Sequence, residues 1–468
     1  MSHRRLLAVL SLPLFALAGC DTVDSVTDSV GSTLGLSSGS PGRVAASSSS
    51  AANRNGVAVS DEPFAARIGA AILSEGGSAA DAVTSIYFAL TATYPVAAGL
   101  GGGGICLVYD PVTRTTTEFD FLTRAANRGG LYAIPAAPRG FHQMQRQFGS
   151  LPWQRTVAPG EQLAGTGFPI SQALAVRLQA AQNIVRLDAS LSAEFLDESG
   201  RPKPAGTSVV NRPLAQSLSE LRLGGADAFY RGAGAMRIVA YANAQGGAIS
   251  AEELAGFAAT QTRARSLNMG GATMMLPRQQ TGAGAFSGAL LETLSRLQAG
   301  TARDPQGAAI QAVQQTLARF GVTALPPDLG ATGFAAVDTG GQAAACAVTL
   351  NGPFGSGHTV SGTGVLLAAS PAGPGGLASA FLAPMIAIDA NGAALTGAGA
   401  GGPYGAAAIA SGLVRMAGGR LPEHSRDLSA TANAAFDTVN AISCRDRACV
   451  ALPDPRAYGA GAASVASQ

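Results

Sequence analysis

The stretch ATGFAAVDTGGQAAACAVTL, residues 331–350, reads as two β-strands joined by a tight turn. Residues 334–337 and 342–350 are runs of small and apolar residues, a pattern typical of buried strands. Asp338-Thr339-Gly340-Gly341 lies between them and contains the residues that hairpin turns prefer. We therefore expect a β-hairpin here, at the point where the chain changes from helical to strand-like patterns.

The segments on either side of this hairpin differ in their periodicity. Upstream, residues 140–300 show mostly helical patterns broken by Gly and Pro. Downstream, strand-like segments at 363–368 and 385–388 precede a glycine cluster at 397–402 and a helix over 406–416. Helices first and strands later, with further helices on the flanks, predict a layered α/β or α+β domain.

The N-terminal part of this domain begins with a short strand at 57–59 and a helix that starts near Pro63. A second helix starts after Ser78, which has Asp81 three residues later, as in a capping box. A glycine run at 101–104 then leads into a strand. Phosphate-binding loops run from a strand through glycines into a helix, so this order excludes one.

The composition excludes several classes of function. Charged residues make up 13% of the 468 residues and the formal net charge is +2, so no basic surface for nucleic acid is expected. No group of Cys and His residues has the spacing of zinc ligands, and no Gly-x-Ser-x-Gly motif is present. We expect no metal, no cofactor and no nucleic-acid partner.

The first twenty residues have the pattern of an export signal. A positive start at His3-Arg4-Arg5 precedes an apolar run at 6–16 that is too short to cross a bilayer comfortably. Leu17-Ala18-Gly19-Cys20 then resembles the lipobox of bacterial lipoproteins, in which the cysteine carries the lipid. An ordinary signal peptide with an incidental cysteine is the alternative.

These features predict where the protein is held. We expect residues 1–20 to be a lipoprotein signal peptide, with Cys20 lipidated, and the Ser/Gly-rich residues 21–56 to be a flexible tether. The domain that follows would then be exported and anchored on the periplasmic side of the inner or the outer membrane.

The four remaining cysteines fall into two groups. Cys444 and Cys449 enclose four residues and would lie in an oxidising compartment, so a short-loop disulfide is expected. Cys106 and Cys346 lie in apolar strand-like runs, where we expect buried free thiols.

Short motifs occur along the chain from residue 57 onward. They are Val57-Ala58-Val59-Ser60, Gly76-Gly77-Ser78-Ala79-Ala80-Asp81-Ala82, Gly101-Gly102-Gly103-Gly104, Phe148-Gly149-Ser150-Leu151-Pro152-Trp153, Gly225-Ala226-Asp227-Ala228-Phe229-Tyr230-Arg231-Gly232, Ile249-Ser250-Ala251-Glu252-Glu253-Leu254, Phe354-Gly355-Ser356-Gly357 and Asp454-Pro455-Arg456. Their number and order resemble the γ-glutamyltranspeptidase family. Residues 57–330 resemble its large subunit and residues 331–468 its small subunit, both parts of one domain.

That resemblance implies the N-terminal-nucleophile hydrolase fold, a four-layer αββα sandwich. It also implies a precursor that cleaves itself and exposes a threonine at the start of the small subunit. The freed α-amine, with a pKa near 8, acts as base for the threonine hydroxyl. Backbone N–H groups of a glycine pair hold the oxyanion.

The resemblance places the nucleophile at the start of the hairpin. The family's small subunit begins Thr-Thr-His-aromatic and continues as a strand to an Asp. Aligned without a gap on Phe334 and Asp338, the nucleophile position falls on Ala331 and the second threonine on Thr332. A shift of one residue would make Thr332 the nucleophile.

Other family positions follow from the same alignment. Thr349 and Asn351 fall on the threonine and asparagine that support the nucleophile and bind the substrate, and Gly401-Gly402 falls near the oxyanion pair.

The residues that bind the glutamyl head group in the family are largely missing. The position of the arginine that clamps the α-carboxylate falls on Leu122, with Arg124 two residues later. Residues 368–376 contain no carboxylate to bind the α-amine, and the two serines of the family fall on Ala380 and Phe381. Such a pocket leaves a zwitterionic head group unpaired.

Two hypotheses remain. In the first, the chain cleaves itself after Ala331, and Thr332 hydrolyses or transfers a γ-glutamyl or related amide group of a small molecule. In the second, the chain is an uncut, non-catalytic relative that binds a ligand or partner at the cell surface. The second hypothesis predicts an intact chain and an occluded or apolar pocket.

Overall fold

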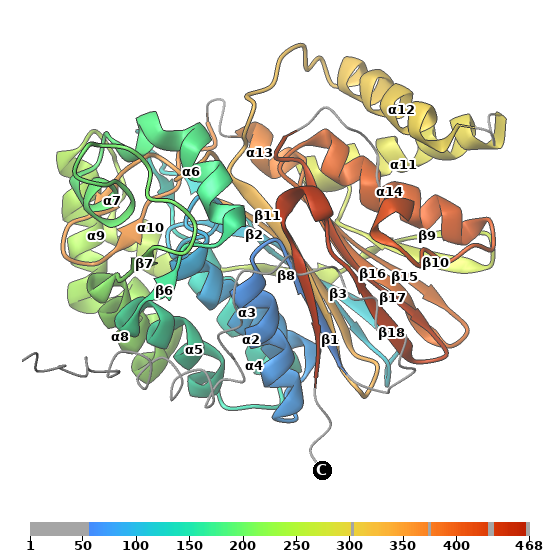
Figure 1. Ribbon diagram of the computed structural model, residues 1–468, viewed down its shortest axis with the longest axis horizontal. Helices are drawn as coiled ribbons and strands as arrows, with labels where there is room; N and C mark the ends of the chain where they lie inside the picture. Colours follow the sequence, from blue (N-terminus) through green and yellow to red (C-terminus); the bar gives the residue numbers. More distant parts are fainter. Residues whose placement is uncertain (1–55, 301–303, 373–375, 429–434, 465–468) are drawn as a thin grey trace, which may run out of the picture. The chain divides into compact units, whose positions relative to one another are not determined.

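Two β-sheets packed face to face form the centre of the computed structural model, which describes residues 56–300, 304–372, 376–428 and 435–464 (Figure 1). The seven-stranded sheet has the order β19 (Ala460–Ala463), β1 (Val57–Ser60), β11 (Ala331–Val337), β12 (Ala343–Thr349), β2 (Gly103–Asp110), β3 (Thr115–Phe121) and β8 (Thr260–Arg263). The six-stranded sheet has the order β18 (Ala448–Leu452), β17 (Thr438–Arg445), β16 (Gly392–Ala400), β15 (Ala383–Asp389), β10 (Ala272–Leu276) and β9 (Arg265–Met269).

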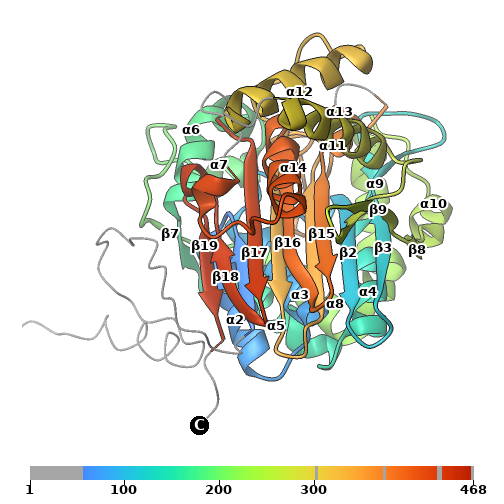
Figure 2. The same cartoon turned by 90° about the vertical axis from the view of Figure 1, so that its right-hand side faces the viewer.

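Helices cover the outer face of each sheet. The seven-stranded sheet is covered by a group that comprises α2 (Pro63–Ser74), α3 (Ala79–Thr93), α4 (Ala137–Phe148), α5 (Trp153–Thr166) and α8 (Arg212–Tyr230). The six-stranded sheet is covered by α14 (Pro403–Ala417), which lies over β16 and β17 together with α11 (Gly282–Gly300) and α12 (Pro305–Arg319) (Figure 2). The four-layer αββα sandwich predicted from the sequence is confirmed.

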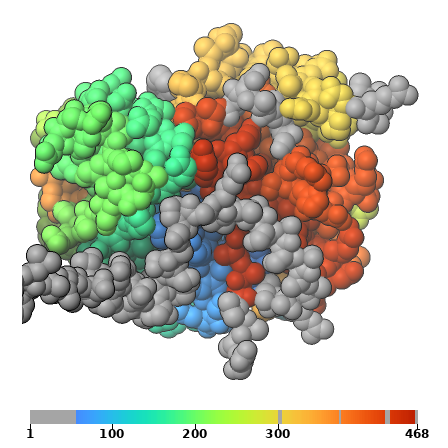
Figure 3. All heavy atoms as spheres, in the orientation of Figure 1, coloured from blue at the N-terminus to red at the C-terminus, as the bar shows by residue number. Residues whose placement is uncertain are grey.

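Further helices and two-residue strands extend the helical layer over the seven-stranded sheet. They are α6 (Gln172–Val185), α7 (Ala189–Phe195), α9 (Gly232–Ala244), α10 (Ala251–Gly256) and the strands β4 (Arg124–Ala125), β5 (Ala133–Ile134), β6 (Phe168–Pro169), β7 (Ser208–Val209), β13 (Thr359–Val360) and β14 (Val365–Leu366). The short helix α13 (Gly376–Ala380) and two 3₁₀ turns, Ser425–Asp427 and Pro455–Ala457, complete the described chain. In the space-filling view, segments from the middle of the sequence (green) gather on one side of the visible face and the C-terminal segments (orange to red) on the other (Figure 3).

The predicted hairpin lies inside the seven-stranded sheet. β11 begins at Ala331, three residues before the predicted strand start, and pairs with β12 from Ala331↔Thr349 to Val337↔Ala343. Both strands are fully buried, because one sheet face meets the helices and the other meets the second sheet. Small side chains suit this position, since they let the two sheets approach closely.

The turn of the hairpin fixes the start of α3. Asp338 accepts hydrogen bonds from the main-chain N–H of Gln342 (3.0 Å) and from that of Ala79 (3.1 Å), and Gln342 Oε1 accepts one from Ala80 N–H (3.0 Å). The capping box of Ser78 and Asp81 is confirmed. The hairpin turn therefore holds the helix N-terminus by direct contacts.

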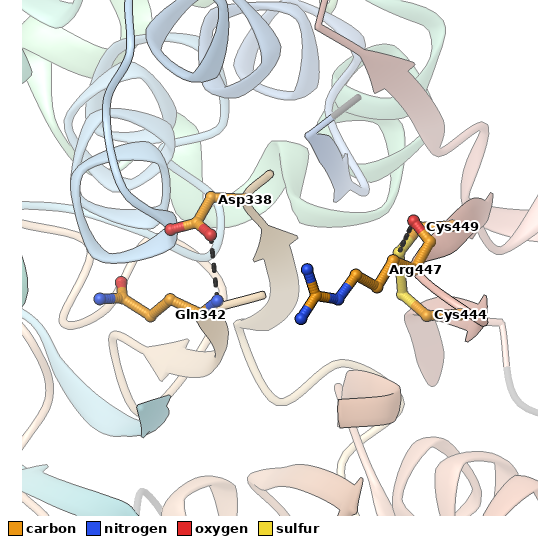
Figure 4. Close-up of a disulfide and its surroundings, with 5 residues drawn as sticks. All are labelled: Asp338, Gln342, Cys444, Arg447 and Cys449. Atoms are coloured by element: carbon orange, nitrogen blue, oxygen red, sulfur yellow. Dashed lines mark hydrogen bonds between the residues drawn. A yellow bond between two sulfur atoms is a disulfide. The ribbon is translucent and has the colours of Figure 1, made fainter. Parts of the chain in front are cut away.

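The cysteines form two disulfides. Cys106 and Cys346 face each other on β2 and β12 and are bonded, so the prediction of two buried free thiols is wrong. The register of β2 against β12 places the two cysteines opposite each other, and the disulfide joins residues 240 apart in sequence. Cys444 is bonded to Cys449 across the β17–β18 hairpin, near the turn that carries Asp338 (Figure 4).

The predicted signal peptide, Cys20 and nearly all of the predicted tether lie outside the described residues. Among the described helices, none is both long and apolar enough to cross a membrane.

Candidate active site

The hydroxyl of Thr332 contacts a buried carboxylate. Thr332 is the second residue of β11 and is fully buried, and its Oγ1 donates a hydrogen bond to Asp61 Oδ2 at 2.7 Å. β1 stops pairing with β11 at Ser60↔Phe334, so Asp61 follows directly after the last paired residue. The aspartate therefore lies beside β11, where β1 no longer continues.

Asp61 receives two more hydrogen bonds, both from β17 of the other sheet. Thr438 Oγ1 donates to Oδ2 at 2.9 Å and Asn440 Nδ2 donates to Oδ1 at 2.7 Å. Burial raises the pKa of Asp61, and the hydrogen bonds from Thr332, Asn440 and Thr438 offset this only in part. A buried carboxylate with a raised pKa can accept the proton of the hydroxyl that it binds.

The carbonyl group of the peptide bond before Thr332 contacts a cation. Arg177, from α6, donates from Nη1 to the carbonyl oxygen of Ala331 at 3.2 Å. Arg177 is buried and its guanidinium is paired with Asp328, with Nε to Oδ2 at 3.0 Å. The guanidinium of Arg177 thus contacts the carbonyl oxygen of the Ala331–Thr332 peptide bond. The hydroxyl of Thr332, on the other side of that bond, is hydrogen-bonded to the carboxylate of Asp61.

The side chain of Ala331, at the family's nucleophile position, lies in an apolar environment. It packs in one cluster with the buried residues Ile105, Ala283, Ala347, Leu382, Ala398 and Ala400, and Leu122 packs against that cluster. Without a hydroxyl, Ala331 cannot attack the carbonyl of Gly330. The side chain of Thr332 alternates to the other face of the strand.

Thr349 and Gly330 hold the start of β11. Thr349 Oγ1 lies 2.9 Å from the carbonyl oxygen of Gly330, to which it donates. Gly330 has φ +60°, and a Cβ there would overlap the carbonyl of Gly352, so only glycine fits. The structure therefore places Thr349 against the carbonyl before Ala331, one peptide upstream of the bond at Thr332.

Asn351 adopts a left-handed conformation, with φ +63°. Its Nδ2 donates to Thr123 Oγ1 and to the carbonyl of Ala369, both at 2.8 Å. Its Oδ1 is buried and has no hydrogen-bond partner among the described residues. That oxygen is free to accept a hydrogen bond from a ligand N–H.

Gly401 and Gly402 lie between β16 and α14. Gly401 has φ +85°, and a Cβ there would overlap the main-chain carbonyl of Phe436, whereas a Cβ on Gly402 would overlap the carboxyl group of Asp437. Asp437 accepts a hydrogen bond from Tyr404 N–H at the start of α14 (2.8 Å), and burial raises the pKa of Asp437 to about 6. The N-terminus of α14 is thus already bound by a carboxyl group of the same chain.

The residues at the family's recognition positions make contacts of their own. Arg124 is exposed, with its guanidinium carbon 5.3 Å from the ring centre of Phe257, and does not take the place of the arginine missing at Leu122. Phe381 is buried against Phe286, with ring centres 4.8 Å apart.

Among the predicted site residues, Thr332 is the one for which the described structure shows a hydrogen bond to Asp61. Thr332 and Thr438 each donate a hydrogen bond to Asp61. Thr438 lies directly after Asp437, and Thr349 pairs with Ala331, the residue next to Thr332. Sequence analysis missed Asp61 and Arg177, because Asp61 has the pattern of a helix start and Arg177 that of a helix interior. Within the described residues, no group of three or more His, Cys, Asp or Glu side chains could hold a metal ion.

The chain is similar to known proteins over much of this architecture. A model of the γ-glutamyltranspeptidase family matches residues 65–320. Among curated proteins, the glutathione hydrolase proenzymes of Bacillus subtilis (strain 168) and Escherichia coli (strain K12) are 29% identical over 201 residues and 30% identical over 228 residues. These matches cover 38% and 44% of the chain but only 34% and 39% of the two relatives.

Solved structures share the fold over a longer stretch. Cephalosporin acylase from Bacillus halodurans superposes with a TM-score of 0.69, covers 88% of this chain and 96% of the acylase, and is 17% identical. The γ-glutamyltranspeptidase of Helicobacter pylori gives a TM-score of 0.50 at 22% identity, over 61% of this chain and 85% of that structure. At these identities the likeness concerns the fold alone.

Proposed function

Since the chain belongs to the γ-glutamyltranspeptidase family, we propose that it is a self-processing enzyme that uses Thr332 to hydrolyse or transfer a γ-glutamyl or related amide group. The observation that carries this proposal is the buried hydrogen bond between Thr332 Oγ1 and Asp61, with Arg177 on the adjoining carbonyl. Nucleophile, base and carbonyl-binding cation meet at one peptide bond, as acyl transfer requires.

Self-cleavage starts with attack of Thr332 Oγ1 on the carbonyl carbon of Ala331. The hydroxyl proton passes to Asp61, and Arg177 stabilises the negative charge that develops on the carbonyl oxygen. The C–N bond then breaks, and the amine of Thr332 takes up a proton. The resulting ester between Ala331 and Thr332 Oγ1 is hydrolysed by water, which leaves a carboxylate on Ala331 and a free amine on Thr332.

The cleaved protein then acts on its substrate. The new α-amine of Thr332 serves as base for its own hydroxyl, which attacks the substrate amide, expels the amine product and forms an ester. Water or an acceptor amine then releases the acyl group. The unpartnered Oδ1 of Asn351 is the acceptor available for a substrate N–H group. The replacement of the family's carboxylate-binding arginine by Leu122 favours a substrate without the full zwitterionic head group of glutathione.

The test is the intact mass and the N-terminal sequence of the purified protein after incubation at neutral pH. After reduction of the Cys106–Cys346 disulfide, which spans the cut, we expect two fragments, the smaller beginning at Thr332. Thr332→Ala should remain a single chain, whereas Thr339→Ala, in the exposed hairpin turn, should cleave normally. One uncut wild-type chain after prolonged incubation would contradict the proposal.

A second function has its own supporting observation. The apolar cluster around Ala331 and the replacement of the family arginine by Leu122 fit an uncut, non-catalytic binding protein. If the wild-type chain stays intact, this second function becomes the better explanation.

We also propose that the protein is exported and anchored on the periplasmic side of a membrane through lipid on Cys20. Support comes from the lipobox-like Leu17-Ala18-Gly19-Cys20 and from the Ser/Gly-rich sequence at 21–56.

A further inference from the structure

A cavity of about 310 Å³ lies in the helical layer, outside the candidate active site. It is bordered by the end of α3, by α7, by the start of α8 and by the β13–β14 hairpin. Its apolar walls include Pro95, Leu100, Leu191, Leu214 and Leu366. The volume is enough for a small organic molecule.

One carboxyl group, that of Glu194 on α7, lines this mostly apolar cavity. Its Oε2 accepts a hydrogen bond from Asn211 Nδ2 at 2.8 Å, and Asn211 Oδ1 in turn caps α8 by accepting from Leu214 N–H at 3.0 Å. Asn211 therefore fixes the orientation of the carboxyl group.

Within the described part of the chain, Glu194 forms no ion pair. The nearby Lys203 instead donates from Nζ to the main-chain carbonyls of Ala193 (3.2 Å) and Glu194 (2.7 Å). Burial raises the pKa of Glu194 to about 8, and the hydrogen bond from Asn211 and the charge of Lys203 only partly offset it. No cation therefore forms an ion pair with this carboxyl group within the described residues, and a bound cation could form one.

A second polar group lines the same cavity. Thr359 is buried, and its Oγ1 has no hydrogen-bond partner among the described residues. Its main-chain N–H donates to Asp188 Oδ2 at 3.0 Å, which fixes the residue in place. A buried hydroxyl without a partner is unfavourable unless a ligand or water completes its bonding.

The geometry points to a second binding site, for a small molecule that combines an ammonium group with an apolar body. The ammonium group pairs with the Glu194 carboxylate and donates a further hydrogen bond to Thr359, while the apolar body fills the space between the leucine and proline side chains. This site does not depend on the proposed function, because it shares no residue with the peptide at Ala331 and Thr332.

The test is isothermal titration calorimetry of the purified protein with 2-phenylethylamine, and with 2-phenylethanol as the ligand control. We expect the amine to bind at least tenfold more tightly than the alcohol. Glu194→Gln keeps the acceptor for Asn211 but removes the charge, so it should weaken amine binding at least tenfold and leave alcohol binding unchanged. Thr359→Val should weaken amine binding to a smaller degree.

Two controls make the result specific. Glu198→Gln, on the exposed segment after α7, should leave amine binding unchanged, and the melting temperature of each variant reports whether it is folded. Binding at pH 7 should also release a proton to the buffer, because Glu194 must ionise to pair with the ammonium group. Lys203 is the charged group beside Glu194, and Asp188 lies against the main chain of Thr359. The proposal is wrong if the amine does not bind, if amine and alcohol bind equally, or if folded Glu194→Gln binds the amine as well as the wild type.

Discussion

Asp61 is held by three donors from two strands, and this explains how a carboxyl group is tolerated in the interior. Thr332, Thr438 and Asn440 supply hydrogen bonds of 2.7–2.9 Å, so each carboxyl oxygen has a partner. Burial nevertheless raises the pKa of Asp61 above its ordinary value of 3.8. The group therefore binds a proton more tightly in the folded than in the unfolded protein.

Replacing Asp61 with Asn tests its role as a base. The amide is nearly isosteric and still accepts from Asn440, but it cannot take the proton of Thr332. We expect self-cleavage of Asp61→Asn to slow by about 10²-fold or more, measured as loss of the intact mass with time. Asp446→Asn, at the exposed turn after β17, should cleave at the wild-type rate. A normal rate in Asp61→Asn would assign the base to another group.

The same residue gives a pH dependence with a definite sign. Because the folded-state pKa is raised, the contribution of Asp61 to stability is fully present below its ordinary pKa of 3.8 and declines as the pH rises toward the folded-state value. The rate of self-cleavage should instead increase with pH, because only the ionised carboxylate of Asp61 can accept the proton of Thr332. Melting temperature and cleavage rate, measured across pH, should thus change in opposite directions, and both changes should be smaller in Asp61→Asn.

At the residue scale, the sequence predicts some of these groups and not others. Thr332, Thr349 and Asn351 lie in one hairpin or directly after it, so a local alignment could name them. Asp61 reaches Thr332 from 271 residues away, and its local pattern indicates only a helix start. The partner of a buried side chain depends on which strands become neighbours, which local sequence does not specify.

At the scale of elements, the two disulfides join strands in different environments. Cys106 and Cys346 are both fully buried in the middle of the seven-stranded sheet, whereas Cys449 is partly exposed on the edge strand β18. Dithiothreitol should therefore reduce Cys444–Cys449 first in the folded protein. Differential alkylation followed by mass spectrometry checks this order, and equal alkylation of all four cysteines in the folded state would contradict it.

The two disulfides should also differ in their effect on stability. Cys106–Cys346 spans 240 residues and Cys444–Cys449 spans 5, so the first restricts the unfolded chain far more. Loop-closure entropy predicts that replacing both Cys106 and Cys346 with Ala destabilises the fold by roughly 3 kcal/mol more than replacing Cys444 and Cys449. Urea unfolding of the two double variants, each made in the uncut Thr332→Ala chain so that the 106–346 loop is continuous, measures the difference.

The hairpin is the element that the sequence predicts best, because turn residues and small apolar residues both mark it. The strand expected over 363–368 is much shorter, as β14 comprises only Val365–Leu366. Part of the glycine cluster at 397–402 lies in β16, where Gly397 and Gly399 bring neighbouring backbones close together. Glycine marks both turns and close packing, so its position alone could not separate these cases.

At the scale of the whole molecule, the anchor is the feature to test. Cys20→Ala should move the protein from the membrane fraction to the soluble periplasmic fraction and abolish the mass increase from the lipid. Thr22→Ala, two residues later, should remain in the membrane fraction. Unchanged membrane association of Cys20→Ala would show that the lipobox-like sequence does not anchor the protein.

The position of β1 constrains the order in which the chain can assemble. Residues 57–60 pair on one side with β11 and on the other with β19, near the C-terminus. The first strand of the described chain thus pairs with the last described strand, which gives a high contact order and predicts slow folding after synthesis is complete. After a cut at Ala331, the two fragments would remain interleaved strand by strand and joined by the Cys106–Cys346 disulfide, so their separation would need both unfolding and reduction.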